Sequence, residues 1–282
     1  LALSATLRIA TAFITAVGIF VWNRIPMGLQ PASSYFQYCM TTVVLAGLMY
    51  EICESYIDDI IVHAQHEDDL LKNLKDVFEI FRRYKIKLNP RKSVIGLLKI
   101  EYVGHQIDAE GMYFTKEKLS EVATFATPQG AKGLRSFLGL TQYFSSHVPQ
   151  YAFYERPLRD VLLKHDKTKK FVWTVEAQDA FLMLQRAVTM CPKLYFLSDN
   201  PDHKIYLRTD ACDYGYGAYL FQVIDGMEHP ILFLSRSLHK QQLRWMIQDK
   251  ECFAIYMALD KFMYLLHSRL LYCRQTVAIS LS

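Results

Sequence analysis

Residues 55–64 read S-Y-I-D-D-I-I-V-H-A, with two adjacent carboxylates, Asp58 and Asp59, between apolar and aromatic neighbours. Burying unpaired carboxylates is costly, so an apolar segment ordinarily excludes such a pair. The flanking residues predict a strand, a turn and a second strand over 52–64, with the two aspartates at the turn. A hairpin tip of this kind places the two sets of carboxylate oxygens close together.

Paired carboxylates repel each other, which raises the pKa of one of them unless a cation is present. Magnesium prefers oxygen ligands, keeps several waters, and is typically shared between one or two carboxylates and substrate phosphates. One interpretation of Asp58 and Asp59 is therefore a metal site for phosphoryl transfer. The alternative is an ordinary polar turn, and the four residues Y-I-D-D do not by themselves distinguish the two.

The composition fits a folded protein with a polyanionic partner. The 282 residues are 51% hydrophobic and 21% charged, which argues against disorder and allows one large domain or two. The net charge is +4, and basic residues gather in two places. The first cluster comprises Arg82, Arg83, Lys85, Lys87, Arg91 and Lys92, and the second comprises Lys164, Lys167, Lys169 and Lys170. Each cluster either faces phosphates or is a solvated helix end.

Three features bear on location and completeness. The six cysteines are scattered without a C-x-x-C motif, which favours reduced, buried thiols in an intracellular, non-secreted protein over a zinc site. The apolar stretch Ile9 to Trp22 is short for a membrane span, so we expect it to be core and expect no membrane partner. The chain begins with Leu1, so we expect a fragment or a processed product.

Periodicity predicts the remaining elements. We expect a hairpin within 12–22, a helix from about Pro31 through Val44, and an amphipathic helix from Glu67 to Tyr84. A second hairpin is expected over 99–114 with D-A-E-G as its turn. Helices follow at 116–125, 131–147, 151–164 and 174–189, strands at 204–209, 216–223 and 229–235, and a last helix at about 241–266. This order predicts an α+β protein with a boundary near Asn200.

Longer motifs around the aspartates resemble a known family. Y-I-D-D-I-I-V is similar to the Y-x-D-D motif of the reverse transcriptases of gypsy-type LTR retrotransposons. T-A-F-I-T-A-V-G-I-F-V-W-N-R-I-P-M-G-L-Q-P-A-S-S-Y-F-Q (11–37) resembles a stretch that precedes it. Y-V-G-H (102–105) resembles the primer-gripping hairpin, and L-R-S-F-L-G-L-T-Q-Y-F (134–144) another family motif. L-R-T-D-A-C-D-Y-G-Y-G-A (207–218) and D-K-E-C-F-A (249–254) resemble the tethered ribonuclease H domain. The matches are collinear over roughly residues 6 to 266.

The resemblance implies a right-hand polymerase fold followed by an incomplete RNase H-like domain. Residues 1–110 would be partial fingers and palm, 111–200 a mostly helical thumb and connection, and 201–282 a truncated RNase H-like domain. The function implied is RNA-directed DNA polymerisation by two-metal chemistry with ribonuclease H activity. The alternative is a non-catalytic nucleic-acid-binding remnant of a retrotransposon.

The resemblance also implies roles for single residues. Asp58 would bind the catalytic metal with Asp59 beside it, and Tyr56 would lie against the primer terminus. Pro26, Met27 and Gly28 would border the incoming nucleotide, although the family usually has Phe at the position of Met27. Gly104 and His105 would hold the primer, His105 being otherwise a strand histidine satisfied by backbone. Both basic clusters would follow the nucleic-acid backbone.

In the last third, Asp210 and Glu251 would be the first two of four carboxylates that hold two metal ions; taken alone, each would be a surface acid. The cofactor implied is Mg²⁺, with Mn²⁺ as an alternative. The partners implied are an RNA/DNA primer–template, deoxynucleoside triphosphates, and flanking Pol domains (protease and integrase) in a parent polyprotein. The location implied is a cytoplasmic particle or the nucleus.

Two departures from the family pattern affect activity. The family has a further aspartate on the strand before T-A-F, which would fall before Leu1, and the tail 267–282 contains no acidic residue. Two-metal catalysis needs such ligands to align the reacting groups. We therefore expect the 282-residue chain alone to be inactive or weakly active.

Overall fold

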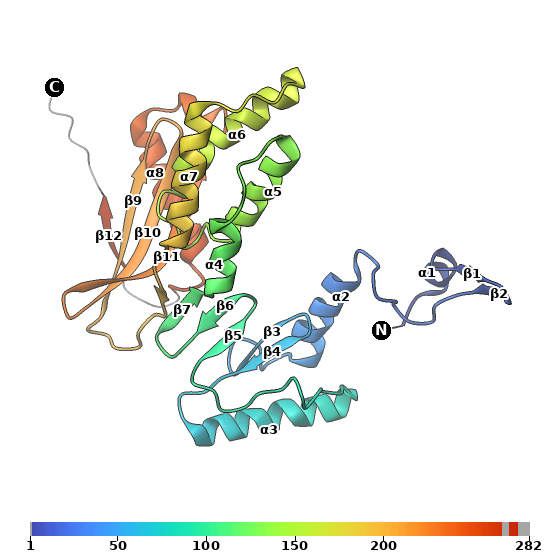
Figure 1. Ribbon diagram of the computed structural model, residues 1–282. Helices are drawn as coiled ribbons and strands as arrows, with labels where there is room; N and C mark the ends of the chain where they lie inside the picture. Colours follow the sequence, from blue (N-terminus) through green and yellow to red (C-terminus); the bar gives the residue numbers. More distant parts are fainter. Residues whose placement is uncertain (1, 267–270, 276–282) are drawn as a thin grey trace, which may run out of the picture. The chain divides into compact units, whose positions relative to one another are not determined.

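The computed structural model describes residues 2–266 and 271–275, and these fall into two compact units, residues 1–98 and 99–282 (Figure 1). Each unit combines helices with small sheets. Because each unit has its own hydrophobic core, the two are described separately.

The first unit contains two hairpins and three helices. Its elements are α1 (Ala5–Ala10), β1 (Phe13–Thr15), β2 (Gly18–Phe20), α2 (Ala32–Cys39), the π-helical turn η1 (Met40–Val44), β3 (Cys53–Tyr56), β4 (Asp59–Val62) and α3 (Glu67–Tyr84). The predicted helices after Pro31 and after His66 are confirmed, the first continuing as the π-helical turn.

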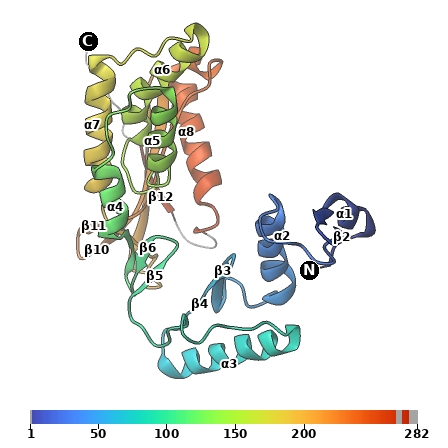
Figure 2. The ribbon, with the colours of Figure 1, turned by 45° about the vertical axis from the view of Figure 1, so that its right-hand side comes forward.

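The core of this unit supports the β3–β4 hairpin. Val77 and Phe81 of α3 are buried with Met40, Leu45 and Cys53. Acidic side chains lie in the first turn of α3 and basic ones in its last turn, which suits the helix dipole. The helix ends where Lys85 takes a left-handed conformation, and Figure 2 shows α3 running alongside the hairpin.

The expectation that the stretch Ile9 to Trp22 is core was wrong. Ile14, Val17 and Ile19 are largely exposed, because a two-stranded hairpin has no second layer on which to bury its faces. The ring of Phe13 packs against the rings of Phe20 and Trp22 instead.

The second unit combines a helical bundle with two sheets. Its helices are α4 (Lys116–Ala123), α5 (Ala131–Gln142), α6 (Tyr151–Thr168), α7 (Val175–Thr189), the 3₁₀ turn η2 (Gln242–Arg244) and α8 (Ile247–Phe262). Its strands are β5 (Ile100–Tyr102), β6 (His105–Ile107), β7 (Gly111–Phe114), β8 (Leu194–Tyr195), β9 (Lys204–Ala211), β10 (Gly215–Ile224), β11 (Met227–Ser237) and β12 (Leu271–Gln275). The other predicted helices and strands of this part exist, with ends shifted by a few residues. The predicted last helix at about 241–266 is instead divided into η2 and α8 by Trp245 and Met246, whose backbones are extended.

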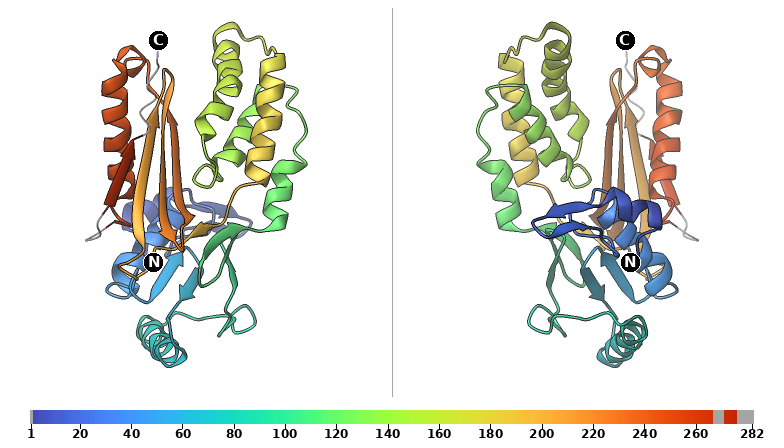
Figure 3. Two further views of the ribbon diagram at one scale, coloured as in Figure 1. Left: turned by 90° about the vertical axis from the view of Figure 1, so that its left-hand side faces the viewer. Right: turned by 90° about the vertical axis from the view of Figure 1, so that its right-hand side faces the viewer.

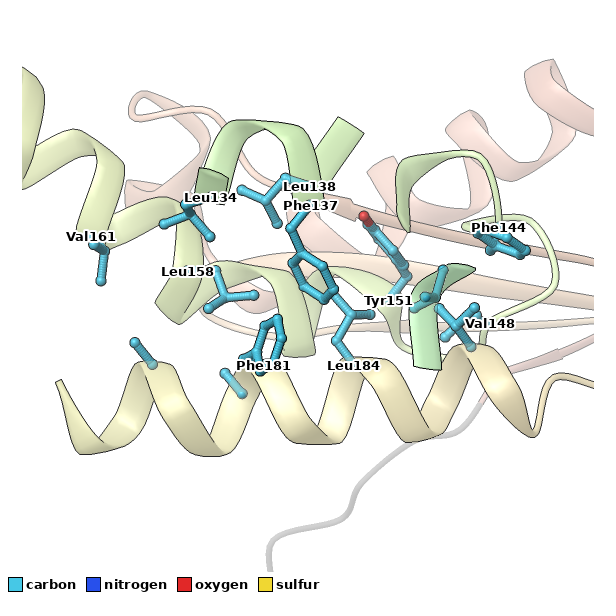
Figure 4. Close-up of a cluster of buried hydrophobic side chains, with 14 of the residues drawn as sticks. Leu134, Phe137, Leu138, Phe144, Val148, Tyr151, Leu158, Val161, Phe181 and Leu184 are labelled. Atoms are coloured by element: carbon cyan, nitrogen blue, oxygen red, sulfur yellow. The ribbon is translucent and has the colours of Figure 1, made fainter. Parts of the chain in front are cut away.

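Helices α4 to α7 enclose an apolar core. Phe137 of α5 packs against Phe181 of α7 with ring centroids 4.5 Å apart, and Leu134, Leu158 and Leu184 fill the space around them (Figure 4). Each of these side chains is buried. Because the buried positions recur every three or four residues, the sequence predicts these helices from its apolar periodicity.

The larger sheet has the strand order β11-β10-β9-β12. β9, β10 and β11 are antiparallel, whereas β12 runs parallel to β9. α8 covers one face of this sheet, with Ala254, Ala258 and Phe262 buried against Leu207 and Leu220 (Figure 3). β12 follows α8 in the chain, and its described residues include no carboxylate.

The prediction of one hairpin over 99–114 was wrong in one respect. D-A-E-G is the turn between β6 and β7, but a second tight turn at Val103-Gly104 divides the first arm into β5 and β6. The sheet therefore has the order β5-β6-β7-β8. Both turn residues have positive φ, +49° and +76°, the pattern of a two-residue type I′ loop.

The division at residues 110 and 200 stays a prediction. Side-chain bonds of Gln222 cross residue 200: its Oε1 accepts from Ser198 N at 3.0 Å, and its Nε2 donates to Phe196 O at 2.9 Å. Further bonds join the helical part to β11, at Ala152 N to Ser235 Oγ and Phe233 N to Ser146 O. These contacts place residues 99–282 in one compact unit.

All six cysteines are free thiols, but of these only Cys53 is buried, and Cys252 and Cys273 are exposed. Across the described ranges, no helix combines the length and the apolar character needed to cross a bilayer.

Candidate functional site

The hairpin β3–β4 presents the two aspartates at its tip. Tyr56 pairs with Asp59, which leaves Ile57 and Asp58 as a two-residue loop. The side chains of Tyr56, Asp58 and Asp59 are exposed. The predicted hairpin is thus confirmed, and its carboxylates are accessible to an ion or a substrate.

The backbone of this loop is held by a side chain from α2. Ile57 has a φ of +55°, in the left-handed region that a β-branched residue rarely adopts. Gln37 Oε1 accepts a hydrogen bond from Ile57 N at 2.5 Å, and Gln37 Nε2 donates to Ser55 O at 2.7 Å. The sequence reasoning assigned no role to Gln37, because its contact with the turn spans 20 residues.

The predicted nucleotide-bordering residues lie in the link between β2 and α2. Pro26 is half-buried, and Met27 and Gly28 are exposed in a turn where Gly28 has a φ of +93°. These three residues are not members of the hydrophobic cluster that supports the hairpin. Their role beside a nucleotide stays a prediction.

The first basic cluster is fully on the surface of the first unit. Arg82 and Arg83 lie in the last turn of α3, Lys85 caps the helix, and Lys87, Arg91 and Lys92 follow in the next loop. All six side chains are exposed, and among the described residues none of them forms an ion pair. Their charges are therefore available to a polyanion.

Gly104 and His105 belong to the second unit, at the β5–β6 turn. The hydroxyl of Tyr143, which follows α5, donates to Val103 O and lies 3.1 Å from His105 Nδ1. A Cβ at Gly104 would lie 3.1 Å from the same hydroxyl, in addition to the strain of a φ of +76°. A cavity of about 530 Å³, lined by Glu101, Lys118 and Tyr143 among others, opens beside this turn.

A second histidine, which the sequence reasoning did not single out, lies beside His105. The ring centroids of His105 and His147 are 5.6 Å apart, and both rings pack on Phe114. Burial lowers the pKa of His147 to about 3, with His105 adding to the effect, and burial also lowers the pKa of His105. Both rings are therefore neutral at physiological pH, and the turn is supported by packing and hydrogen bonds.

The predicted acids of the last third come together. Asp210 lies exposed near the end of β9, and Glu251 lies in the first turns of α8. Glu251 Oε1 accepts a hydrogen bond from Ala211 N at 3.3 Å, whereas its Oε2 is buried without a hydrogen-bond partner among the residues that the structure describes. Burial raises the pKa of Glu251, and the charge of Asp210 raises it further.

The neighbouring loop is tightly built. A Cβ at Gly215 would lie 2.9 Å from Arg236 O, so the backbones of β10 and β11 approach closely there. The ammonium of Lys250 is buried and lies 3.3 Å from the carboxylate of the exposed Asp213. Sequence reasoning missed this pair, since nothing in the spacing of the two residues indicates contact.

The donor atoms fit divalent metal ions in part. Within residues 2–266 and 271–275, no three His, Cys, Asp or Glu side chains gather closely enough to hold an ion by themselves. Magnesium, however, commonly binds one or two carboxylates and completes its shell with water and substrate phosphates. The exposed pair Asp58 and Asp59 suits this mode, and the partnerless Glu251 Oε2 beside Asp210 suits a cation.

Two family models match the chain. Residues 2–107 match the model described as reverse transcriptase (RNA-dependent DNA polymerase), and residues 173–272 match the RNase H-like domain found in reverse transcriptase. The chain is 29% identical over 259 residues to the Transposon Tf2-3 polyprotein of Schizosaccharomyces pombe. It is 32% identical over 261 residues to the Retrovirus-related Pol polyprotein from transposon 297 of Drosophila melanogaster.

These alignments cover 91% and 92% of this chain but only 19% and 24% of the two polyproteins. Among solved structures, a foamy viral protease-reverse transcriptase in complex with double-stranded DNA is similar over 97% of this chain and 47% of that chain, with a TM-score of 0.76 and 20% identity. The same viral protein in complex with an RNA/DNA hybrid gives a TM-score of 0.75, at 20% identity over 97% of this chain and 36% of that chain. The predicted α+β reverse-transcriptase fold is thereby confirmed.

Proposed function

Because this chain belongs to the reverse transcriptases with an RNase H-like domain that form part of LTR-retrotransposon Pol polyproteins, we propose that its residues serve RNA-directed DNA synthesis. The observation that carries the proposal is the pair of exposed carboxylates at the β3–β4 tip, inside the segment that matches the polymerase model. The substrates proposed are an RNA/DNA primer–template and deoxynucleoside triphosphates.

The two families use divalent metals, and we assign Mg²⁺, or Mn²⁺, to Asp58 and Asp59. When bound, the ion supplies positive charge that activates the primer 3′-hydroxyl and neutralises the triphosphate. Asp58 and Asp59 contribute oxygen ligands on a rigid strand pair, and the exposed ring of Tyr56 offers a face to the primer end. Pro26, Met27 and Gly28 border the nucleotide in this proposal.

Nucleic-acid binding is assigned to the basic surface and to the β5–β6 turn. Arg82, Arg83 and their neighbours neutralise backbone phosphates, which needs no base-specific contact. Gly104 brings the backbone of a tight turn to the surface, where it holds the primer together with His105. The six free thiols support an intracellular location.

In the RNase H-like domain, Asp210 and Glu251 are proposed as metal ligands for hydrolysis of the RNA strand. The buried Oε2 of Glu251 supports this assignment, because a carboxylate oxygen without a donor is stabilised by a cation. Ala211 N keeps the other oxygen of Glu251 in place at the end of β9.

The test is binding of a fluorescent RNA-template/DNA-primer duplex to the 282-residue chain. We expect salt-dependent binding that tightens when Mg²⁺ and the next complementary deoxynucleotide are added. Asp58→Asn should abolish the tightening. Tightening that survives Asp58→Asn would contradict the assignment. Binding that responds neither to Mg²⁺ nor to changes at Asp58 and Asp210 would favour a non-catalytic nucleic-acid-binding remnant instead.

A further inference from the structure

We propose that Gln37 is a positioning residue for the Asp58–Asp59 turn, holding its backbone in the conformation that aims the two carboxylates at one ion. This inference rests on the proposed function of those aspartates. Gln37 is the last residue of the family-like stretch 11–37, but that match assigns it no task, and the residue is uncharged and 20 positions away from Ile57.

The turn needs an external support because of its central residue. A two-residue hairpin loop matches the strand twist when its first central residue has positive φ, which glycine, asparagine or aspartate adopts most readily. Here that residue is Ile57, with a φ of +55°. A β-branched side chain disfavours this conformation, and such residues persist only where the surroundings hold them.

Gln37 holds the loop from both sides with one carboxamide. Its Oε1 accepts from Ile57 N at 2.5 Å and its Nε2 donates to Ser55 O at 2.7 Å. A donor and an acceptor on one planar group fix both the position and the orientation of the loop relative to the end of β3. Asparagine, one methylene shorter, would not span the same distance from α2.

The support is itself anchored in the core. Gln37 lies in the last turn of α2, immediately before the π-helical turn η1, whose Met40 is buried with Cys53 of β3. π-helical turns are frequent next to functional sites. Because Asp58 follows Ile57 directly, a shift of the Ile57 peptide moves Asp58 relative to Asp59, which is fixed by its pairing with Tyr56.

The first measurement is amide hydrogen exchange of Ile57, resolved to single residues by fragmentation mass spectrometry, in the metal-free 282-residue chain. Gln37→Met keeps the side-chain length and removes both hydrogen bonds, so the Ile57 amide should exchange at least tenfold faster. Gln37→Glu keeps an acceptor for Ile57 N but sets a carboxylate oxygen against Ser55 O in place of the donor, so the Ile57 amide should also exchange faster than in the wild-type chain. Gln65→Met, at an exposed glutamine of the loop after β4, is the matched control and should leave Ile57 unchanged.

The second measurement is backbone cleavage by Fe²⁺, ascorbate and peroxide, with Fe²⁺ replacing Mg²⁺. The wild-type chain and Gln65→Met should be cut near residues 56–60, and Gln37→Met should lose most of this cleavage while retaining its circular dichroism spectrum. Unchanged exchange at Ile57 or unchanged cleavage in Gln37→Met would overturn the role of Gln37 alone. Absence of cleavage near the turn in the wild-type chain would overturn the metal site, and with it the proposed function.

If Gln37→Met fails to fold, Gln37→Glu decides the question by itself. Wild-type protection of the Ile57 amide in a folded Gln37→Glu chain would show that the paired hydrogen bonds of Gln37 do not hold the turn, and the proposal would be wrong.

Discussion

The hydroxyl of Tyr143 donates a hydrogen bond to the carbonyl of Val103, 40 positions earlier in the chain. This bond ties the segment after α5 to the β5–β6 turn, where both loop residues have positive φ. The turn that carries Gly104 is thus held by a side chain from another element, as the Ile57 turn is held by Gln37.

Replacing Tyr143 with Phe removes this bond and keeps the ring. We expect a loss of about 1 kcal/mol in the free energy of unfolding, the usual net value of a neutral hydrogen bond. Urea unfolding of the wild-type chain and of Tyr143→Phe measures the difference. Tyr113→Phe, at a β7 tyrosine whose hydroxyl makes no hydrogen bond among the described residues, is the matched control. Equal losses in the two variants would contradict the assignment.

The buried His147 predicts a pH dependence of stability. Its pKa is lowered to about 3 in the folded chain, against an ordinary value of 6.5, so the unfolded chain binds the proton more readily between these two values. The contribution of the neutral His147 ring to the free energy of unfolding is complete above pH 6.5. It is lost as the pH falls toward 3, by up to about 1.4 kcal/mol per pH unit. His147→Phe should flatten the dependence of the unfolding free energy on pH in this window. An unchanged slope would show that the ring is not buried as described.

The pair Asp210 and Glu251 predicts that metal ions stabilise the RNase H-like domain. Burial and the charge of Asp210 oppose ionisation of Glu251. A bound cation neutralises the two carboxylates and so stabilises the folded chain, which should raise the melting temperature. The gain is about 2.7 kcal/mol at a concentration 100 times Kd. Thermal melts with and without Mg²⁺ should show the gain in the wild-type chain and in the control Glu176→Gln, but a smaller one in Glu251→Gln. A full gain in Glu251→Gln would exclude the site.

The basic cluster predicts a change in salt dependence. In double-stranded nucleic acid each phosphate contact contributes about 0.9 to the slope of log affinity against log salt concentration. Arg82→Gln with Arg83→Gln should therefore lower the slope by up to about 2 for a primer–template duplex. Lys72→Gln with Lys75→Gln removes two exposed charges from the same helix and should leave it nearly unchanged. Equal effects of the two pairs would mean that net charge, and not the cluster, drives binding.

Local patterns predicted the elements of both units well. Apolar residues at three- and four-residue spacing from Leu70 to Tyr84 predicted α3. The apolar residues around Asp58 and Asp59 predicted the hairpin with the acids at its tip. These predictions succeed because helix and strand periodicities depend on neighbours a few positions apart.

Contacts between distant residues were not predictable in the same way. Val103-Gly104 is not one of the Asn-Gly or Asp-Gly pairs that usually indicate a type I′ loop, so the extra turn there was recognised only from its positive φ angles. The supports of the two tight turns, Gln37 and Tyr143, act over 20 and 40 positions, a separation at which spacing carries no information. The sequence also failed to predict that Ile14 and Val17 are exposed. The hydropathy of a strand does not show whether another layer of the protein covers it.

The most direct test is a Mn²⁺ titration followed by electron paramagnetic resonance. In a chain carrying Asp210→Asn and Glu251→Gln, the remaining high-affinity Mn²⁺ should bind at Asp58 and Asp59. Adding Asp58→Asn should weaken it by about tenfold or more, or about 1.4 kcal/mol, whereas adding Glu79→Gln on the exposed side of α3 should not. An Mn²⁺ affinity that stays the same after Asp58→Asn would contradict the central claim that the β3–β4 tip holds a divalent ion.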